Sequence, residues 1–145
     1  FESMPVGEGS IFPLPLAALA QHPVAILAAY PGAEAVLVDA ASSHFAGLVI
    51  EGLGSGNMGA GMGEGVARAL DAGISVVVST RVPYGKSSLA YGGTGGGATL
   101  ADKGAVNAGE FRPGQARILL AAALATGTPV VKVFETAAAP KQYAR

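Results

Sequence analysis

Residues 47–61, GLVIEGLGSGNMGAG, decide the fold. Gly47–Gly52 is a short, mainly apolar run of strand length, and such a run is typical of a strand that is buried on both faces of a parallel sheet. A glycine-rich turn, Leu53–Gly61, follows it directly. Met62–Ala72 then has the apolar spacing of a helix, and Gly73 is its C-terminal stop. Strand, glycine-rich turn and helix together predict a βαβ unit.

The same alternation continues in both directions along the chain. Pro23–Ala29 and Ile74–Ser79 are two further apolar runs of strand length, and Ala33–Ser43 has helical spacing. Arg112–Ala125 predicts a long helix with a proline in its first turn, and Thr128–Phe134 (TPVVKVF) predicts a last strand. This order predicts an α/β fold: a small Rossmann-like or flavodoxin-like three-layer domain with a parallel sheet of about four strands.

The remaining segments lack periodicity. Residues 1–22 contain several glycines and prolines and are expected to be an extended lead-in or interdomain linker, which leaves 23–145 as the folded domain. Arg81–Lys103 includes a Gly-Gly-Gly run and is expected to be a mobile loop. The end of the chain, 137–145, is expected to fray. The chain begins at Phe1 rather than methionine, which suggests a piece of a longer protein.

Composition and charge argue against several classes of function. Only 13% of the residues are charged and the net charge is −1, so neither nucleic acid nor an acidic membrane is an expected partner. The chain has no cysteine, which excludes disulfides and thiolate metal sites. The apolar stretch Ile11–Ala29 is interrupted by Pro13, Pro15 and Pro23, so it cannot form a continuous membrane-spanning helix. We expect a cytoplasmic protein, with a periplasmic or secreted location left open.

The turn Gly54–Gly59 (GSGNMG) is the first candidate site. It satisfies the pattern G-x-G-x-x-G between a strand and a helix, which is typical of dinucleotide binding. The next strand does not end in the acidic residue that would bind a ribose, although Arg81 there could suit a 2′-phosphate, so an NADP site stays open. The alternatives are a purely structural turn and a loop that binds a ligand through its backbone and the Asn57 amide.

Other polar clusters are expected to have structural or surface roles. Ser42-Ser43-His44 lacks a third, orienting group, and His22 has no partner at metal-ligand spacing, so we predict no metal site. Lys86-Ser87-Ser88 could pair a base with a nucleophile, but we expect it to be part of a solvated loop. Arg117 is expected to form a structural ion pair with a carboxylate such as Asp39.

Several short motifs follow one another in a fixed order. They are Tyr30-Pro31-Gly32, Gly54-Ser55-Gly56-Asn57, Gly73–Val77, Ser79–Pro83 and Ala105–Arg117. Together, over roughly residues 23–126, they resemble the C-terminal domain of the bacterial L-asparaginase/glutaminase family. The resemblance implies a Rossmann-like domain of a two-domain amidohydrolase that converts asparagine to aspartate and ammonia without a cofactor.

The resemblance also implies where the chemistry resides. In this family the catalytic threonines belong to an N-terminal domain whose motifs are not found here, so no catalytic residue is expected in this chain. The turn is implied to reach the active site of a neighbouring subunit in a homodimer or homotetramer. There Asn57 is implied to hold the α-amino end of the substrate. Gly54, Ser55, Gly56 and Asn57 are thus the predicted substrate-binding residues.

One departure from the family pattern affects substrate choice. Some members place a carboxylate, for the substrate ammonium, in the loop after the third strand. This chain has no acidic residue between Arg81 and Asp102. The preference for asparagine or glutamine therefore stays open, and so does the alternative of a non-catalytic interaction module.

Overall fold

A four-stranded parallel sheet forms the centre of the molecule. The computed structural model describes residues 16–138. The strands lie in the order β1-β2-β3-β4 and are all parallel. Their bounds are β1 Val24–Ala28, β2 Gly47–Gly52, β3 Ser75–Thr80 and β4 Val106–Asn107. The predicted α/β fold with a parallel sheet of about four strands is confirmed.

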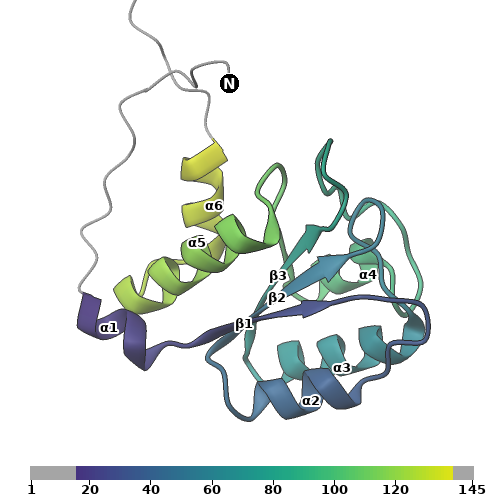
Figure 1. Cartoon of the computed structure of the whole chain (residues 1–145), viewed down its shortest axis with the longest axis horizontal. Helices are drawn as coiled ribbons and strands as arrows, with labels where there is room; N and C mark the ends of the chain where they lie inside the picture. The colour runs from purple at the N-terminus through teal and green to yellow at the C-terminus, as the bar shows by residue number, and fades with distance from the viewer. Residues whose placement is uncertain (1–15, 139–145) are drawn as a thin grey trace, which may run out of the picture.

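Helices cover both faces of this sheet (Figure 1). The helices are α1 Leu16–Gln21, α2 Val36–Ser42, α3 Ala60–Asp71, α4 Gly97–Asp102, α5 Pro113–Thr126 and α6 Val130–Ala138. The pair α2 and α3 packs on one face, with α4 beside α3, whereas α5 crosses the other face and contacts α1 and α6. These are the three layers that the sequence predicts.

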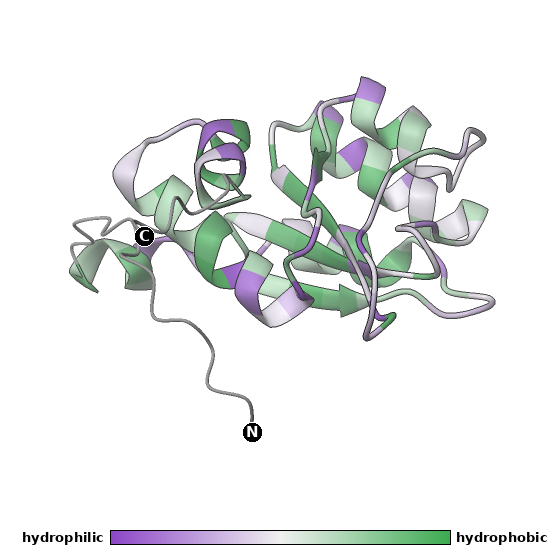
Figure 2. Ribbon diagram, turned by 90° about the horizontal axis from the view of Figure 1, so that it is seen from above, coloured by the Kyte–Doolittle hydropathy of each residue, from purple (hydrophilic) through white to green (hydrophobic). Residues whose placement is uncertain are grey.

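The central strands are buried on both sides. Leu48 and Ile50 of β2 belong to the core under α2 and α3, and Val49 between them belongs to the core under α5. All three side chains have no exposed surface, and each contributes about 1.5–3 kcal/mol by leaving water. Figure 2 shows the apolar residues following one another along the strands and the inner helix faces. At the sheet edge the pattern weakens, because Ile26 of β1 is 39% exposed.

Local sequence explains where the helices begin and end. In α3, Met62, Val66 and Ala69 share one buried face, which follows from their spacing along the helix. The helix α5 begins with a proline at its first position. It ends at Gly127, whose φ of 65° is the left-handed conformation that glycine adopts at low cost.

The prediction of a last strand over Thr128–Phe134 is wrong. Val130–Ala138 forms α6 instead. Val133 and Phe134 are buried, whereas Val131 is half exposed, so the apolar residues follow a helical period of which Val130 is the first member. The run of β-branched valines suggested a strand, but packing against α5 decided the outcome. The fourth strand is β4, which is too short to produce an alternation pattern.

Two segments that were expected to lack regular structure contain helices. Leu16–Gln21, within the expected linker, forms α1, and Gly97–Asp102, within the expected mobile loop, forms α4. That loop also contains the buried side chains of Ser87 and Leu89. The expected fraying tail begins within α6, and its part beyond Ala138 lies outside the described residues. No helix in the described range is long and apolar enough to cross a membrane.

Candidate functional site

The predicted site lies at the carboxyl edge of the sheet, between β2 and α3. The connections that leave β1, β2 and β3 meet at this edge because the strands are parallel (Figure 1). The edge is where open α/β sheets bind ligands. The turn closes on itself: Leu53 N–H donates to Asn57 O (2.7 Å), and Asn57 N–H donates to Leu53 O (2.9 Å). Gly54 and Gly56 have φ angles of 52° and 114°, which glycine adopts without strain.

The Asn57 side chain is largely unengaged. The residue is half-buried, and within residues 16–138 its amide makes one hydrogen bond, in which Nδ2 donates to Ser55 Oγ at 3.5 Å. That distance is at the long limit for a hydrogen bond. A primary amide offers two donor hydrogens and an acceptor oxygen. The turn therefore holds the Asn57 backbone while leaving most of the amide available to a ligand.

Neighbouring elements hold the turn in place. Thr80 Oγ1, at the end of β3, donates to Gly54 O at 2.5 Å. Ser88 N–H donates to Ser55 O at 3.0 Å. The backbone also approaches closely, since a Cβ on Gly52 would lie 2.8 Å from Gly56 Cα. The glycines of GLGSGN thus permit a compact turn against β3 and the loop that follows it.

The Ser42-Ser43-His44 cluster does not form a catalytic arrangement. Ser42 Oγ donates to Val38 O (2.8 Å), and Ser43 Oγ donates to Asp39 O (3.3 Å). Both are bonds from a serine to the carbonyl four residues earlier in the same helix. His22 Nδ1 lies 2.8 Å from the carbonyl oxygen of residue 18 in the same manner. The structural roles expected from the sequence agree with this geometry.

The Lys86-Ser87-Ser88 segment is only partly the solvated loop that was expected. Lys86 and Ser88 are exposed, but Ser87 is 1% exposed. Ser87 Oγ lies 2.5 Å from Asn107 Oδ1, to which it donates, so its hydroxyl is engaged away from the lysine. The serine therefore lacks the base that a nucleophile needs. Asn107 lies within the Ala105–Arg117 motif, but the sequence alone predicts no role for it, because its partner Ser87 is twenty residues away along the chain.

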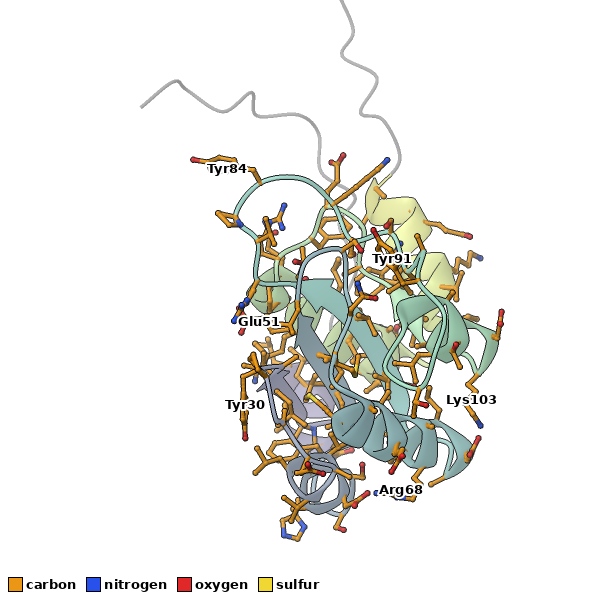
Figure 3. The ribbon with its side chains drawn as sticks, turned by 90° about the vertical axis from the view of Figure 1, so that its right-hand side faces the viewer. Tyr30, Glu51, Arg68, Tyr84, Tyr91 and Lys103 are labelled. Atoms are coloured by element: carbon orange, nitrogen blue, oxygen red, sulfur yellow. The ribbon has the colours of Figure 1, made fainter. Side chains whose placement is uncertain are left out.

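The predicted Arg117–Asp39 ion pair is wrong. Arg117 Nε donates to Val24 O at 2.9 Å, and Asp39 pairs with Arg68 at 2.7 Å. The reason is topological: Arg117 is on α5 and Asp39 is on α2, which cover opposite faces of the sheet. The hydrogen bond to Asp39 raises the pKa of Arg68, which lies on the outer face of α3 (Figure 3).

The geometry disfavours a dinucleotide at the GxGxxG turn. A carboxylate oxygen of Glu34 lies 2.5 Å from where a Cβ on Gly61 would stand, so an acidic group occupies the first turn of α3. A dinucleotide would place its pyrophosphate at this helix end, where it would meet like charge. Arg81, the candidate for a 2′-phosphate, is exposed at the end of β3.

The connections that leave β1 and β3 at the carboxyl edge of the sheet carry exposed tyrosines. Tyr30 follows β1, and Tyr84 and Tyr91 follow β3; they are 47%, 87% and 62% exposed. Figure 3 shows Tyr84 projecting away from the body of the protein. Tyrosine is enriched in protein interfaces, where its ring contributes area and its hydroxyl a hydrogen bond. This distribution is what a face that meets another protein surface would show.

Comparison with known proteins identifies the family. Residues 23–135 match the family model described as the glutaminase/asparaginase C-terminal domain. A glutamyl-tRNA(Gln) amidotransferase subunit of Pyrococcus furiosus is 33% identical over 76 residues, which are 52% of this chain and 17% of that protein. The chain therefore aligns with less than a fifth of this relative. Because the family model covers most of the chain, including every strand and the GSGN turn, the protein belongs to the glutaminase/asparaginase C-terminal domain family.

Proposed function

We propose that this chain is the substrate-completing domain of an asparaginase-like amidohydrolase, and that residues 23–145 work beside a separate catalytic domain. The observation that carries the proposal is the state of Asn57: its backbone is held by two hydrogen bonds, whereas its side-chain amide makes one long hydrogen bond within the part of the chain that the structure describes. The family match supports an amide-processing enzyme. The serine clusters at Ser42-Ser43-His44 and Lys86-Ser87-Ser88 offer no nucleophile paired with a base.

In the proposed reaction, the catalytic domain supplies a hydroxyl that attacks the side-chain amide carbonyl of asparagine. The bond to nitrogen breaks, ammonia leaves, and water then releases aspartate from the acyl-enzyme. Asn57 contributes by position: its amide oxygen accepts a hydrogen bond from the α-ammonium group. Holding the substrate in a fixed orientation lowers the entropic part of the barrier. The Asn57 amide is neutral, so it binds the ammonium group through a hydrogen bond and not through an ion pair.

The partner in this proposal is a neighbouring subunit, within a homodimer or homotetramer, whose catalytic domain receives the turn. The exposed rings of Tyr30 and Tyr84 on connections at the same edge support such an interface. Gly54, Ser55 and Gly56 contribute the shape of the turn rather than chemistry. Residues 1–22 would then lead in from the catalytic domain.

A second candidate function is transfer of the amide nitrogen to an acceptor other than water. It is favoured by one observation, the similarity to an amidotransferase subunit. The two candidates differ in what happens without an acceptor. Hydrolysis releases ammonia from asparagine or glutamine alone, whereas a dedicated transferase releases little until its acceptor and partner subunits are present.

The test of the main proposal is Asn57→Ala in the full-length protein that carries this chain. Loss of a hydrogen bond to a charged group costs about 1.5–3 kcal/mol, so kcat/KM for asparagine should fall about 10- to 100-fold. Stability should change by less than about 0.5 kcal/mol, because the side chain packs little. Ser43→Ala, which removes a side-chain hydrogen bond at the end of α2, outside the turn, is the control.

Two outcomes would contradict the proposal. Unchanged kinetics in Asn57→Ala would remove the assigned role of the amide. Rapid asparagine hydrolysis by the 145-residue chain alone would show that the chemistry does not need a separate catalytic domain.

A further inference from the structure

A segment of the long loop, in which the side chains of Ser87 and Leu89 are buried, lies against the GSGN turn. We call Ser87, Ser88 and Leu89 the supporting segment. Ser88 N–H donates to Ser55 O at 3.0 Å. A Cβ placed on Gly56 would lie 3.1 Å from Leu89 Cδ2 and 3.6 Å from Ser87 Cβ, so both side chains cover this glycine. The residue immediately before Asn57 therefore rests on the supporting segment.

The supporting segment is itself held by Asn107 at the end of β4. Ser87 Oγ donates to Asn107 Oδ1 (2.5 Å), and Asn107 Nδ2 donates to Ser87 O (3.1 Å). Asn107 Oδ1 also accepts from Gly109 N–H at 3.0 Å. The hydroxyl has one hydrogen, and the other acceptor within reach, Gly109 O, is farther away, at 3.2 Å. Ser87 and Asn107 thus form a reciprocal pair that joins the loop to the sheet.

Leu89, the last residue of the supporting segment, has an unusual backbone conformation. Its φ of 46° makes it the one non-glycine residue between 16 and 138 with a positive φ. This conformation is unfavourable for a branched side chain and persists only where the surroundings impose it. The side chain is 8% exposed and belongs to the core under α3, next to Val78. The backbone conformation directs Leu89 under the turn instead of into solvent.

We propose that Ser87 and Asn107 are positioning residues for Asn57. The contacts run from Asn107 to Ser87, from Ser88 to Ser55, and through the turn to the Asn57 amide. A loop without a carboxylate thus acts on the substrate site indirectly, by setting the position of the turn. The kinetic consequence rests on the proposed function, whereas the mechanical coupling does not.

The coupling is tested by amide hydrogen exchange on the 145-residue chain. In Ser87→Ala the Ser88 amide should exchange about tenfold faster, because one hydrogen bond that holds the segment is lost. The backbone amide of Asn57 should also exchange faster, while backbone amides of α5, such as that of Leu120, should keep their rates. Ser42→Ala, which removes a half-buried serine hydroxyl bonded within α2, is the matched control and should leave the turn unchanged.

Two variants of Asn107 should change the exchange rate of the turn amides by different amounts. Because the Asn107 side chain is exposed, neither variant leaves a cavity in the core. Asn107→Ala removes all three of its side-chain hydrogen bonds and should accelerate exchange at least as much as Ser87→Ala. Asn107→Asp keeps an acceptor for Ser87 Oγ and Gly109 N–H and should lie between the alanine variant and wild type. Equal acceleration of turn and α5 amides, or unchanged turn amides in Asn107→Ala, would overturn the coupling.

Kinetics in the full-length protein test the functional part. Ser87→Ala should raise the KM for asparagine about fivefold, with a smaller change in kcat, because it loosens the position of Asn57 without removing the amide. In an Asn57→Ala background it should have no further effect, because it acts through that side chain. Additive losses would overturn the positioning role. If the full-length protein hydrolyses no amide at all, the proposed function fails, and the exchange measurements still decide whether Ser87 and Asn107 hold the turn.

Discussion

Replacement of Gly56 by alanine should destabilise the protein more than the same replacement at Gly54, although both glycines belong to one turn. Gly54 has a φ of 52°, and no atom of residues 16–138 lies within 4 Å of a Cβ added there. Gly56 has a φ of 114°, and an added Cβ would lie 3.1 Å from Leu89 Cδ2 and 3.2 Å from Val78 Cγ1. The two positions therefore separate backbone strain from crowding.

The magnitudes follow from these two causes. At Gly54 the conformation is within the left-handed region, which costs an L-residue about 1–2 kcal/mol. Reduced entropy of the unfolded chain offsets about 0.4–1 kcal/mol of that, so the net loss should be about 1 kcal/mol. At Gly56 the backbone is further from any favourable region, at about 1–3 kcal/mol, and crowding adds about 1–3 kcal/mol. With the same offset from the unfolded chain, the net loss there should be about 1–5 kcal/mol, centred on about 3 kcal/mol.

Urea unfolding of the 145-residue chain measures the difference directly. Both variants should keep the wild-type m value, because the surface exposed on unfolding is unchanged. The midpoint should fall further for Gly56→Ala than for Gly54→Ala. Equal losses at the two positions would refute the reasoning, since they would mean that Leu89 and Val78 do not limit the space above Gly56.

The remaining predictions concern the core and the corrected ion pair. Leu120→Ala should cost about 2–5 kcal/mol in urea unfolding, because this side chain of α5 is fully buried against the sheet and the cavity cannot collapse onto a rigid sheet. Arg117→Ala should cost about 1 kcal/mol through loss of its hydrogen bond to the β1 backbone, and Asp39→Asn should not change that cost in a double-mutant cycle. Arg68→Ala should have a small effect that shrinks as sodium chloride is added, because the pair with Asp39 is exposed.

Much of the fold could be predicted from local patterns. The strand Gly47–Gly52 was predicted with the bounds that the structure has, because a continuous apolar run between glycines has few other stable placements. The helix that contains Met62 and Val66 was predicted for the same kind of reason, although it begins two residues earlier than expected. The motif order also identified the family, since it reflects turns whose glycines the backbone requires.

Interactions between distant segments could not be predicted in this way. The valine-rich run over 130–134 became a helix because α5 offered an apolar surface with helical spacing to match. The two-residue strand β4 exists because β3 provides unpaired backbone groups beside it. Neither cause is visible in a local window, because each depends on what lies next to the segment in space.

The candidate site likewise has one part that local sequence predicts and one part that only tertiary contacts decide. Short-range sequence accounts for the glycine turn that carries Asn57, since positive φ angles and close backbone approach are local demands on residue type. Folding alone brings Ser87 and Asn107 together and places Leu89 beneath Gly56, because these contacts join residues twenty or more positions apart. Residue identity thus supplies the amide that we propose contacts a ligand, and long-range packing supplies its position.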